Sequence, residues 1–471
     1  MNLRRVAGNA AAAFAAQGVA LLVSMVTTLV VPKMLGVEEF GYWQLFVFYA
    51  SYVGFFHLGL NDGVYLLNGG RTRADIDVRD VNGQMLMGFC MQSLPALAIV
   101  IFAFLGEPGA ERSFVLVSVA PYMLAKNTAC YLGYLFQALD ETRAWSASCV
   151  IERVAFVVPM LLLIVLRVED FRFYVAAYLV ATFIQLAYLV WHGRVLLARG
   201  SAPLGASFRS AVGSVRVGIK LMLANIASML VLGVARASID AAWGIEAFGQ
   251  LSLTLSMVNF FLSFVTQAAM VLFPALRQVS GEGLRKFFAL SRDLLSLLMP
   301  AVYLVYFPIA WLLAAWLPQY ADSLIYLPYL LPICVFESKM SICCATYYKV
   351  TRKEGELLRL NVAVSIIGAI GSLFGAFVLH SVHAVILSAV LAIAGRSIWA
   401  EKAIAHELGL PVSFCIALGE VLITILFVVM STLLPAFASS ILYVSCYVAF
   451  LTLNRFRVGE LIAGVHERLH D

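Results

Sequence analysis

Apolar residues occur along this chain in long runs, separated by short polar or charged segments. Val6–Pro32, Val81–Gly106 and Leu294–Ala321 contain no Asp, Glu, Lys or Arg. Each run exceeds the roughly 20 apolar residues that a helix needs to cross the hydrocarbon of a bilayer. The period-2 alternation of membrane strands is absent, so the runs favour helices. The pattern predicts an all-α polytopic membrane protein.

Applied along the whole chain, this length rule predicts about fourteen transmembrane helices. The expected ranges are Gly8–Pro32, Phe40–Asn61, Val81–Leu105, Ser113–Ala138, Trp145–Leu166, Phe171–Leu196, Val217–Ile239, Ala247–Ala275, Phe287–Leu313, Ser323–Lys349, Leu357–Leu379, Val382–Lys402, Pro411–Leu433 and Ser439–Asn454. The last two are separated at Pro435, because proline interrupts a helix.

Composition agrees with a membrane location. Of 471 residues, 62% are hydrophobic and 13% are charged, and the mean hydropathy is +0.92. Soluble domains carry roughly 25% charged residues, so this chain has too few to cover a globule in water. The formal net charge of +5 is modest, and no nucleic-acid partner is expected. The apolar run after Arg5 is too long for a signal peptide, so we expect it to remain as the first helix.

Lys and Arg are distributed unevenly between the connections. They gather, by roughly four to one, in the loops that share one side with the N-terminus. Basic residues mark the cytoplasmic side of a membrane protein. We therefore expect a multi-pass protein of the cell (inner) membrane, with both termini in the cytoplasm.

A short phrase occurs twice in the chain. "GVEEFGYW" (36–43) follows the first expected helix and "GIEAFGQL" (244–251) follows the seventh. A second, weaker similarity relates "PYMLAK" (121–126) to "PICVFE" (332–337). Six helices separate the copies, and an even number predicts a parallel repeat of two six-helix lobes. We interpret the phrase as an outer-face connection, with Glu in water and the aromatic residue at the membrane interface.

The repeat divides the chain into three parts. Residues 1–200 form an N-terminal lobe, 201–405 a C-terminal lobe, and 406–471 an additional helix pair. The polar segment from Arg199 to Arg216, rich in Gly and Ser, is expected to be the link between the lobes.

No sequence pattern indicates catalysis. The chain has no P-loop, no HExxH and no Gly-x-Ser-x-Gly, and its connections are too short for a soluble catalytic domain. The eight cysteines lie in apolar segments without a CxxC pair, so neither disulfides nor a metal site are expected. Two lobes around a cavity indicate a carrier, not an enzyme, with no cofactor apart from a coupling H⁺ or Na⁺.

Two stretches resemble a known family. "LGVEEFGYWQLFVFYASYVGFFHLGLNDGVYLLNGG" (35–70) and "ARASIDAAWGIEAFGQLSLTLSMVNFFLSFVTQAAMVLFPALR" (235–277) resemble bacterial polysaccharide-biosynthesis membrane proteins, the O-antigen and capsule flippases. These belong to the multidrug/oligosaccharidyl-lipid/polysaccharide (MOP) exporter superfamily. The resemblance covers most of the chain in helix layout, but the last two helices carry no recognised motif. It implies a flippase that moves undecaprenyl-pyrophosphate-linked oligosaccharide repeat units to the outer leaflet by alternating access. It transfers no particular binding residue.

Ionisable residues inside the expected helices are the candidate site, because charges in a membrane are expensive. Lys126, Arg153, Lys220 and Lys339 are the candidate cavity cations for a lipid pyrophosphate. We expect Lys126 and Arg153 to face the space between the lobes. Each could instead form a structural ion pair, and Lys220 could extend to the inner surface.

Candidate coupling or gating residues are Glu152, Glu337, Arg236, Asp240 and Asp62. Arg236 and Asp240 are four residues apart, which also suits a salt bridge at a helix end. Asp62 in "GLNDG" is also consistent with a polar cap. Glu420 is expected at the membrane interface.

A cation-coupled multidrug antiporter of the same superfamily is the alternative function. Such a carrier should have an acidic cavity, whereas the deep charges here are slightly more basic than acidic. A membrane-embedded glycosyltransferase is disfavoured by the short outward loops. The expected partners are a lipid-linked oligosaccharide and membrane lipid, with glycosyltransferases and a polysaccharide polymerase acting beside the carrier.

Overall fold

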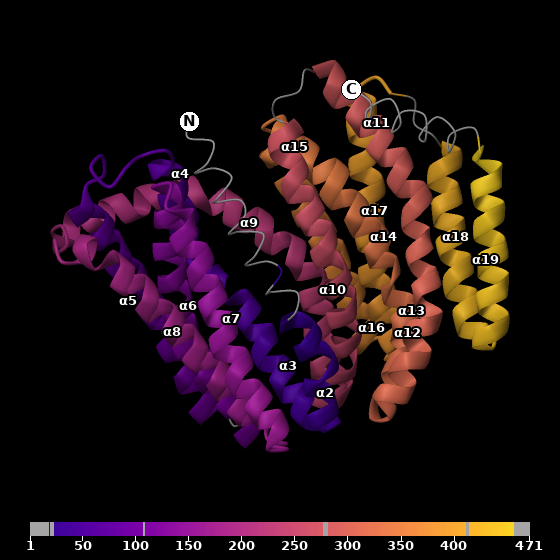
Figure 1. Cartoon of the computed structure of the whole chain (residues 1–471), viewed down its shortest axis with the longest axis horizontal. Coiled ribbons are helices and arrows are strands. Elements are labelled where there is room, and N and C mark those ends of the chain that lie inside the picture. The colour runs from indigo at the N-terminus through magenta and orange to yellow at the C-terminus, as the bar shows by residue number, and fades with distance from the viewer. Residues whose placement is uncertain (1–17, 19–22, 107–108, 277–280, 411–413, 456–471) are drawn as a thin grey trace. The chain divides into compact units, whose positions relative to one another are not determined.

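The described part of the chain consists of helices and the short segments that connect them. The computed structural model describes all residues except 1–17, 19–22, 107–108, 277–280, 411–413 and 456–471, and the described residues contain no strand (Figure 1). Ten of their helices are long and apolar enough to cross a membrane, and Val23–Met34 and Ala417–Leu433 are shorter apolar helices. The prediction of an all-α multi-pass membrane protein is confirmed. Most of the first expected helix lies outside the described residues.

The chain divides into two compact units, Met1–Ile226 and Ala227–Asp471. The first unit contains α2 (Val31–Met34), α3 (Val37–Tyr52), η1 (Val53–His57), α4 (Leu60–Asn68), α5 (Val78–Leu105), α6 (Ala110–Ala138), α7 (Thr142–Val165), α8 (Phe171–Leu197) and the first part of α9 (Leu204–Trp243). Helix α6 is its central helix, because it contacts α3, α4, α5, α7 and α8. A side chain on α6 therefore has protein on most sides.

The second unit contains the rest of α9 and the helices that follow. They are α10 (Ile245–Leu276), α11 (Gly281–Leu298), η2 (Met299–Ala301), α12 (Val302–Trp316), η3 (Pro318–Tyr326), α13 (Leu327–Leu330), α14 (Pro332–Lys339), η4 (Met340–Ala345, a π-helix), α15 (Thr346–Val350), α16 (Glu354–Phe377), α17 (Val382–Glu407), α18 (Phe414–Leu433) and α19 (Ala436–Leu453). Its core lies where α14, η4 and α15 pack against α10 and α17. A smaller core of stacked tyrosines and Phe427 attaches α18 and α19 to α12.

The second expected helix is broken in the structure. Helix α3 ends at Tyr52, η1 follows, and Leu58 and Gly59 adopt left-handed backbone angles (φ 48° and 83°) before α4 begins. The break leaves backbone groups without helical partners, and side chains satisfy some of them. Asn127 of α6 donates to the carbonyl of Val53 (2.8 Å), and the ring of His57 accepts from the Gly59 amide (3.0 Å).

Helix α9 corrects the expected linker. The segment from Arg199 to Arg216 was expected to be a polar link, but α9 already begins at Leu204 and continues for 40 residues. Its small residues allow close packing: Ser214 donates to Gln84 of α5 (2.7 Å). Gly and Ser in this segment therefore serve close packing between helices. In the sequence alone, the same residues are also typical of a flexible linker.

The repeated phrase begins a helix in each unit. Gly36 and Gly244 directly precede α3 and α10, and the exposed Glu38 and Glu246 lie in the first turns, where a negative charge is favoured by the helix dipole. The expectation of Glu in water therefore fits both copies. The expectation of an interfacial aromatic does not, because Phe40 and Phe248 are fully buried.

Candidate functional site

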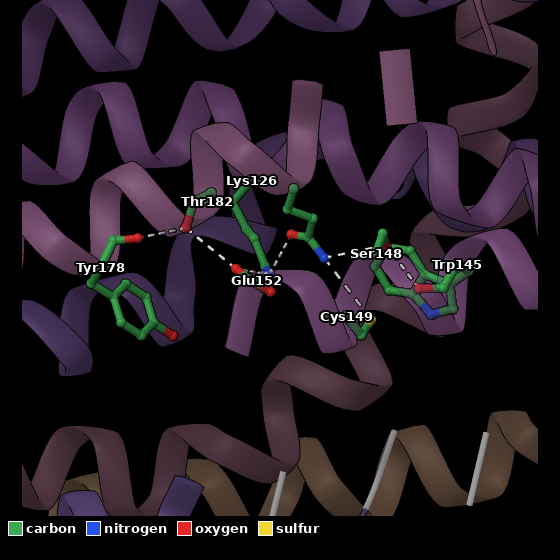
Figure 2. Close-up of polar contacts among 8 residues, drawn as sticks. Lys126, Trp145, Ser148, Cys149, Glu152, Tyr178 and Thr182 are labelled. Carbon is green, nitrogen blue, oxygen red and sulfur yellow. Dashed lines mark hydrogen bonds and ion pairs between the residues drawn. The ribbon is translucent and has the colours of Figure 1, made fainter. Parts of the chain in front are cut away.

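Lys126 and Glu152 form a partly buried ion pair in the first unit. Lys126 Nζ lies 2.7 Å from both carboxylate oxygens of Glu152 and donates to Gln185 Oε1 at 3.1 Å. Thr182 donates to Glu152 Oε1 at 3.3 Å. Figure 2 shows the pair with Thr182 on one side and the Ser148–Cys149 segment on the other. The structure thus brings together two of the candidate residues, with three helices contributing.

Local sequence explains how these side chains meet. Thr182 and Gln185 are three residues apart on α8, so they lie on the same helix face, and both are fully buried. At the α6–α7 contact Gly133 packs against the ring of Trp145, and a side chain at Gly133 would overlap it. Sequence reasoning missed Thr182 and Gln185, although two polar residues at this spacing in an apolar helix are a usable signal.

Arg153 follows Glu152 in the sequence but does not take part in the ion pair with Lys126. Successive helical residues leave the helix about 100° apart, so Arg153 starts from a different face of α7 than Glu152. Its side chain is half-buried, and within the described residues it makes no hydrogen bond or ion pair. Tyr178 and Cys149 lie within its electrostatic range. The site thus contains a paired cation, Lys126, and a cation without a carboxylate partner among the described residues.

An aromatic cluster encloses one side of this site. Tyr178 contacts Phe156, Tyr122 and Phe46 with ring centroids 5.0, 5.7 and 5.8 Å apart. Trp43 stacks on Phe156 at 5.8 Å and is 3% exposed. These rings pack against one another and form an apolar wall beside the pair, whose side chains remain 22% and 14% exposed.

The second unit contains a larger charge cluster. Lys339 is 1% exposed; its ammonium donates to Glu420 and forms an ion pair of 2.7 Å with Glu401. Glu337 pairs with Arg396. The expectation that Glu420 lies at the membrane interface is corrected, because its side chain is 1% exposed and contacts Lys339. Sequence reasoning missed Glu401 and Arg396 as partners, since 59 or more residues separate the helices involved.

The remaining candidate residues lie apart from these pairs. Asp62 is 7% exposed on α4, with His57 Nε2 at 4.0 Å from its carboxylate. Arg236 donates to Ser252 (2.8 Å) and lies over the ring of Phe248. Asp240 is half-buried one helical turn further on, and Lys220 is exposed on α9.

The charged side chains described here are suited to ion pairing and to binding a charged ligand. Where the chain is described, no group of three or more His, Cys, Asp or Glu side chains is placed to hold a metal ion. Two of the four acids proposed for coupling, Glu152 and Glu337, are engaged by cations, and a third, Asp62, lies 4.0 Å from His57. What remains is an arginine near a water-poor aromatic cluster, a combination that suits an anionic ligand.

Comparisons with known proteins agree with this architecture. Residues 6–280 match the family model described as "Polysaccharide biosynthesis protein". The chain is similar in structure to an inward-facing multidrug resistance MATE family transporter of the MOP superfamily (TM-score 0.64, 12% identity, covering 83% of this chain and 94% of that one). It is also similar to the lipid II flippase MurJ in an inward closed conformation (TM-score 0.61, 11% identity, covering 96% and 99%). No curated protein matches the sequence. The match over more than half of its length shows that this chain belongs to the polysaccharide biosynthesis protein family, and it has the fold of MOP-superfamily transporters.

Proposed function

We propose that this protein is a flippase for undecaprenyl-pyrophosphate-linked oligosaccharide repeat units. It moves them from the inner to the outer leaflet of the cell membrane by alternating access. Family membership and the MurJ-like fold support this class of carrier. The proposed orientation, with both termini in the cytoplasm, presents the substrate-loading side to the glycosyltransferases that build the repeat unit.

The observation that carries the proposal is Arg153. It is half-buried in an apolar helix and has no carboxylate partner among the described residues. A charge in such a place is unfavourable unless a ligand or water compensates it. A guanidinium can donate two parallel hydrogen bonds to phosphate oxygens, so a pyrophosphate is a fitting ligand. Lys220, exposed on α9, is a second candidate contact.

The pairing of the acids disfavours the multidrug alternative. A carrier of cationic drugs needs an ionised carboxylate available to the substrate. Here Glu152 is held by Lys126, and Glu337 is held by Arg396. Opening either acid to a drug would leave a partly buried lysine or the buried Arg396 unpaired, at a cost in free energy that is largest for Arg396.

Deletion of the gene tests the function. We expect loss of surface polysaccharide and accumulation of lipid-linked repeat units facing the cytoplasm, measured by extraction of the lipid fraction and by surface labelling. Re-expression of the intact protein should restore the polymer. Unchanged surface polysaccharide together with new sensitivity to cationic dyes would contradict the proposal and favour the antiporter.

A further inference from the structure

The charge cluster of the second unit joins three helices. It consists of Glu337 and Lys339 on α14, Arg396 and Glu401 on α17, and Glu420 on α18. Helix α18 belongs to the C-terminal pair, which lies outside the two expected six-helix lobes. This additional helix therefore supplies a carboxylate to the core of the unit.

The cluster has more acids than bases. Two cations, Lys339 and Arg396, face three carboxylates, so full ionisation would leave one excess negative charge (2 − 3 = −1). Lys339 and Glu420 are each 1% exposed, and Arg396 is 2% exposed. The side chains of Glu401 and Glu337 are 13% and 26% exposed, so solvent reaches Glu420 least. An excess charge buried as deeply as Glu420 is neutralised by binding a proton.

The hydrogen bonds point to the two acids around Lys339. Glu420 Oε1 is buried and has no hydrogen-bond partner in the described part of the chain. Glu401 Oε2 lies 2.7 Å from the ammonium of Lys339, in an ion pair. The buried hydroxyl of Ser296 lies close enough to Glu420 to interact with its carboxylate. Glu420 Oε1 is therefore available to bind a proton.

A metal ion suits the cluster less well than a proton. The ammonium of Lys339 already lies against both carboxylates, in the place that a cation bridging them would occupy. A second cation there would be repelled at short range. A bound proton leaves no separate cation beside the ammonium, because it converts one carboxylate into a neutral carboxylic acid.

The other titratable groups around the two acids come from three elements. Tyr303 on α12 and Cys343 and Cys344 on η4 lie within electrostatic range. On α11, which packs against α18, Arg292 pairs with its neighbour Asp293. Helix η4 is a π-helix that starts directly after Lys339. Such π-helical turns often mark functional sites, since their hydrogen bonds rearrange easily.

We propose that Glu401 and Glu420 share one exchangeable proton beside Lys339, and that this proton is the ion coupled to transport. Uptake converts one carboxylate and one H⁺ into a carboxylic acid, and release reverses it. With the proton bound the cluster is neutral; without it, Lys339 is attracted to two charged acids. The coupling part of this inference rests on the proposed transport function, whereas the proton-binding part does not.

Infrared spectroscopy of the purified protein in lipid bilayers tests proton binding. We expect the C=O band of a protonated carboxyl group at neutral pH, shifted by exchange into D₂O. Glu401→Gln and Glu420→Gln each leave two acids facing two cations, so either change should remove the band. Because these variants have balanced charges, we expect both to fold. Glu407→Gln is the matched control, since Glu407 lies on the same helix but pairs with Lys353 at the surface.

Three results would overturn the proposal. The first is absence of the band from the intact protein, or its persistence in both variants. The second is a carboxylate signal that responds to sodium and not to pH. The third is surface-polymer export by Glu401→Gln and Glu420→Gln at the level of Glu407→Gln, with equal abundance, which would remove the coupling role. If deletion of the gene leaves the surface polymer intact, the proposed function fails, while the infrared result still decides the proton site.

Discussion

At the scale of single residues, Arg153 is the position where the proposed function is easiest to contradict. Arg153→Ala removes a charge-assisted contact to phosphate, worth roughly 1.5–3 kcal/mol. We therefore expect polymer export to fall at least about tenfold while protein abundance stays normal. Arg153→Lys should restore export only in part, because an ammonium cannot replace the bidentate fork. Export and abundance are measured in the same cells.

Arg143→Ala is the matched control. Arg143 is exposed near the start of the same helix, about 15 Å from Arg153 along its axis. We expect this variant to export normally. Normal export from a well-expressed Arg153→Ala protein would exclude Arg153 from the substrate site.

The Lys126–Glu152 pair makes a different prediction. Its side chains are 22% and 14% exposed, so Lys126→Met leaves a mostly buried carboxylate unpaired, at a cost of about 3–5 kcal/mol. We expect a lower thermal midpoint in detergent and reduced abundance in the membrane. The double change Lys126→Met with Glu152→Leu should recover most of the loss, since no charge is then left unpaired.

A surface pair provides the comparison. Lys286 and Glu282 are four residues apart on α11, with side chains 68% and 76% exposed. Lys286→Met should change stability by less than about 1 kcal/mol. If Lys126→Met were as mild as Lys286→Met, the buried pair would not have the structural role assigned to it.

At the scale of elements, the contact between α4 and α9 depends on glycine. A side chain at Gly218 of α9 would overlap the backbone of Gly59 and Gly63. Backbone cannot move aside as a flexible side chain can, so we expect Gly218→Ala to destabilise the protein by about 1–3 kcal/mol or more. The decrease is measured as a lower thermal midpoint.

Gly213→Ala tests whether this effect is local. Gly213 lies five residues earlier on α9, and a side chain there would meet nothing within 4 Å. Alanine is favoured over glycine inside a helix by up to about 1 kcal/mol, so this variant should be neutral or slightly more stable. Equal losses from both substitutions would mean that helix propensity, and not close packing, is responsible.

The break between α3 and α4 is also a property of elements. Left-handed Leu58 is unfavourable for a residue with a side chain, and the surroundings maintain it. Asn127 contributes most visibly, because it donates to both the Val53 carbonyl and Gln92 while its own carbonyl accepts from Asn61. A polar residue deep in α6 therefore compensates the backbone groups that a neighbouring helix exposes.

At the scale of the whole molecule, orientation in the membrane is the main prediction. The loop before α5 is expected in the cytoplasm and the loop between α7 and α8 outside. Cysteines introduced at the exposed positions Ala74 and Glu169 report on these two loops. A membrane-impermeant thiol reagent should label Glu169→Cys in intact cells and Ala74→Cys only after permeabilisation. The unmodified protein gives the background from Cys90, which is exposed. Labelling in the opposite order would reverse the assigned orientation.

The sequence alone determined the fold class and most helix positions. Long apolar runs leave little choice, because in a bilayer each backbone polar group must bond within its own helix. The ranges of α18 and α19 follow directly from the apolar segments around Pro435. Arg153 could likewise be singled out, since any charge in such a run is conspicuous.

Tertiary structure alone decided which charges meet. Lys339 looked like a free cavity cation, yet its partners Glu401 and Glu420 lie 62 and 81 residues further along the chain. Helical period cannot reveal such contacts, because it orders residues within one helix and says nothing about which helix packs beside it. For the same reason the sequence did not reveal that α9 begins at Leu204, because its glycine and serine residues pack closely against α4 and α5, which are distant in the sequence. The composition of a segment predicts whether it lies in lipid or in water. Which side chains it contacts depends on which helices pack beside it.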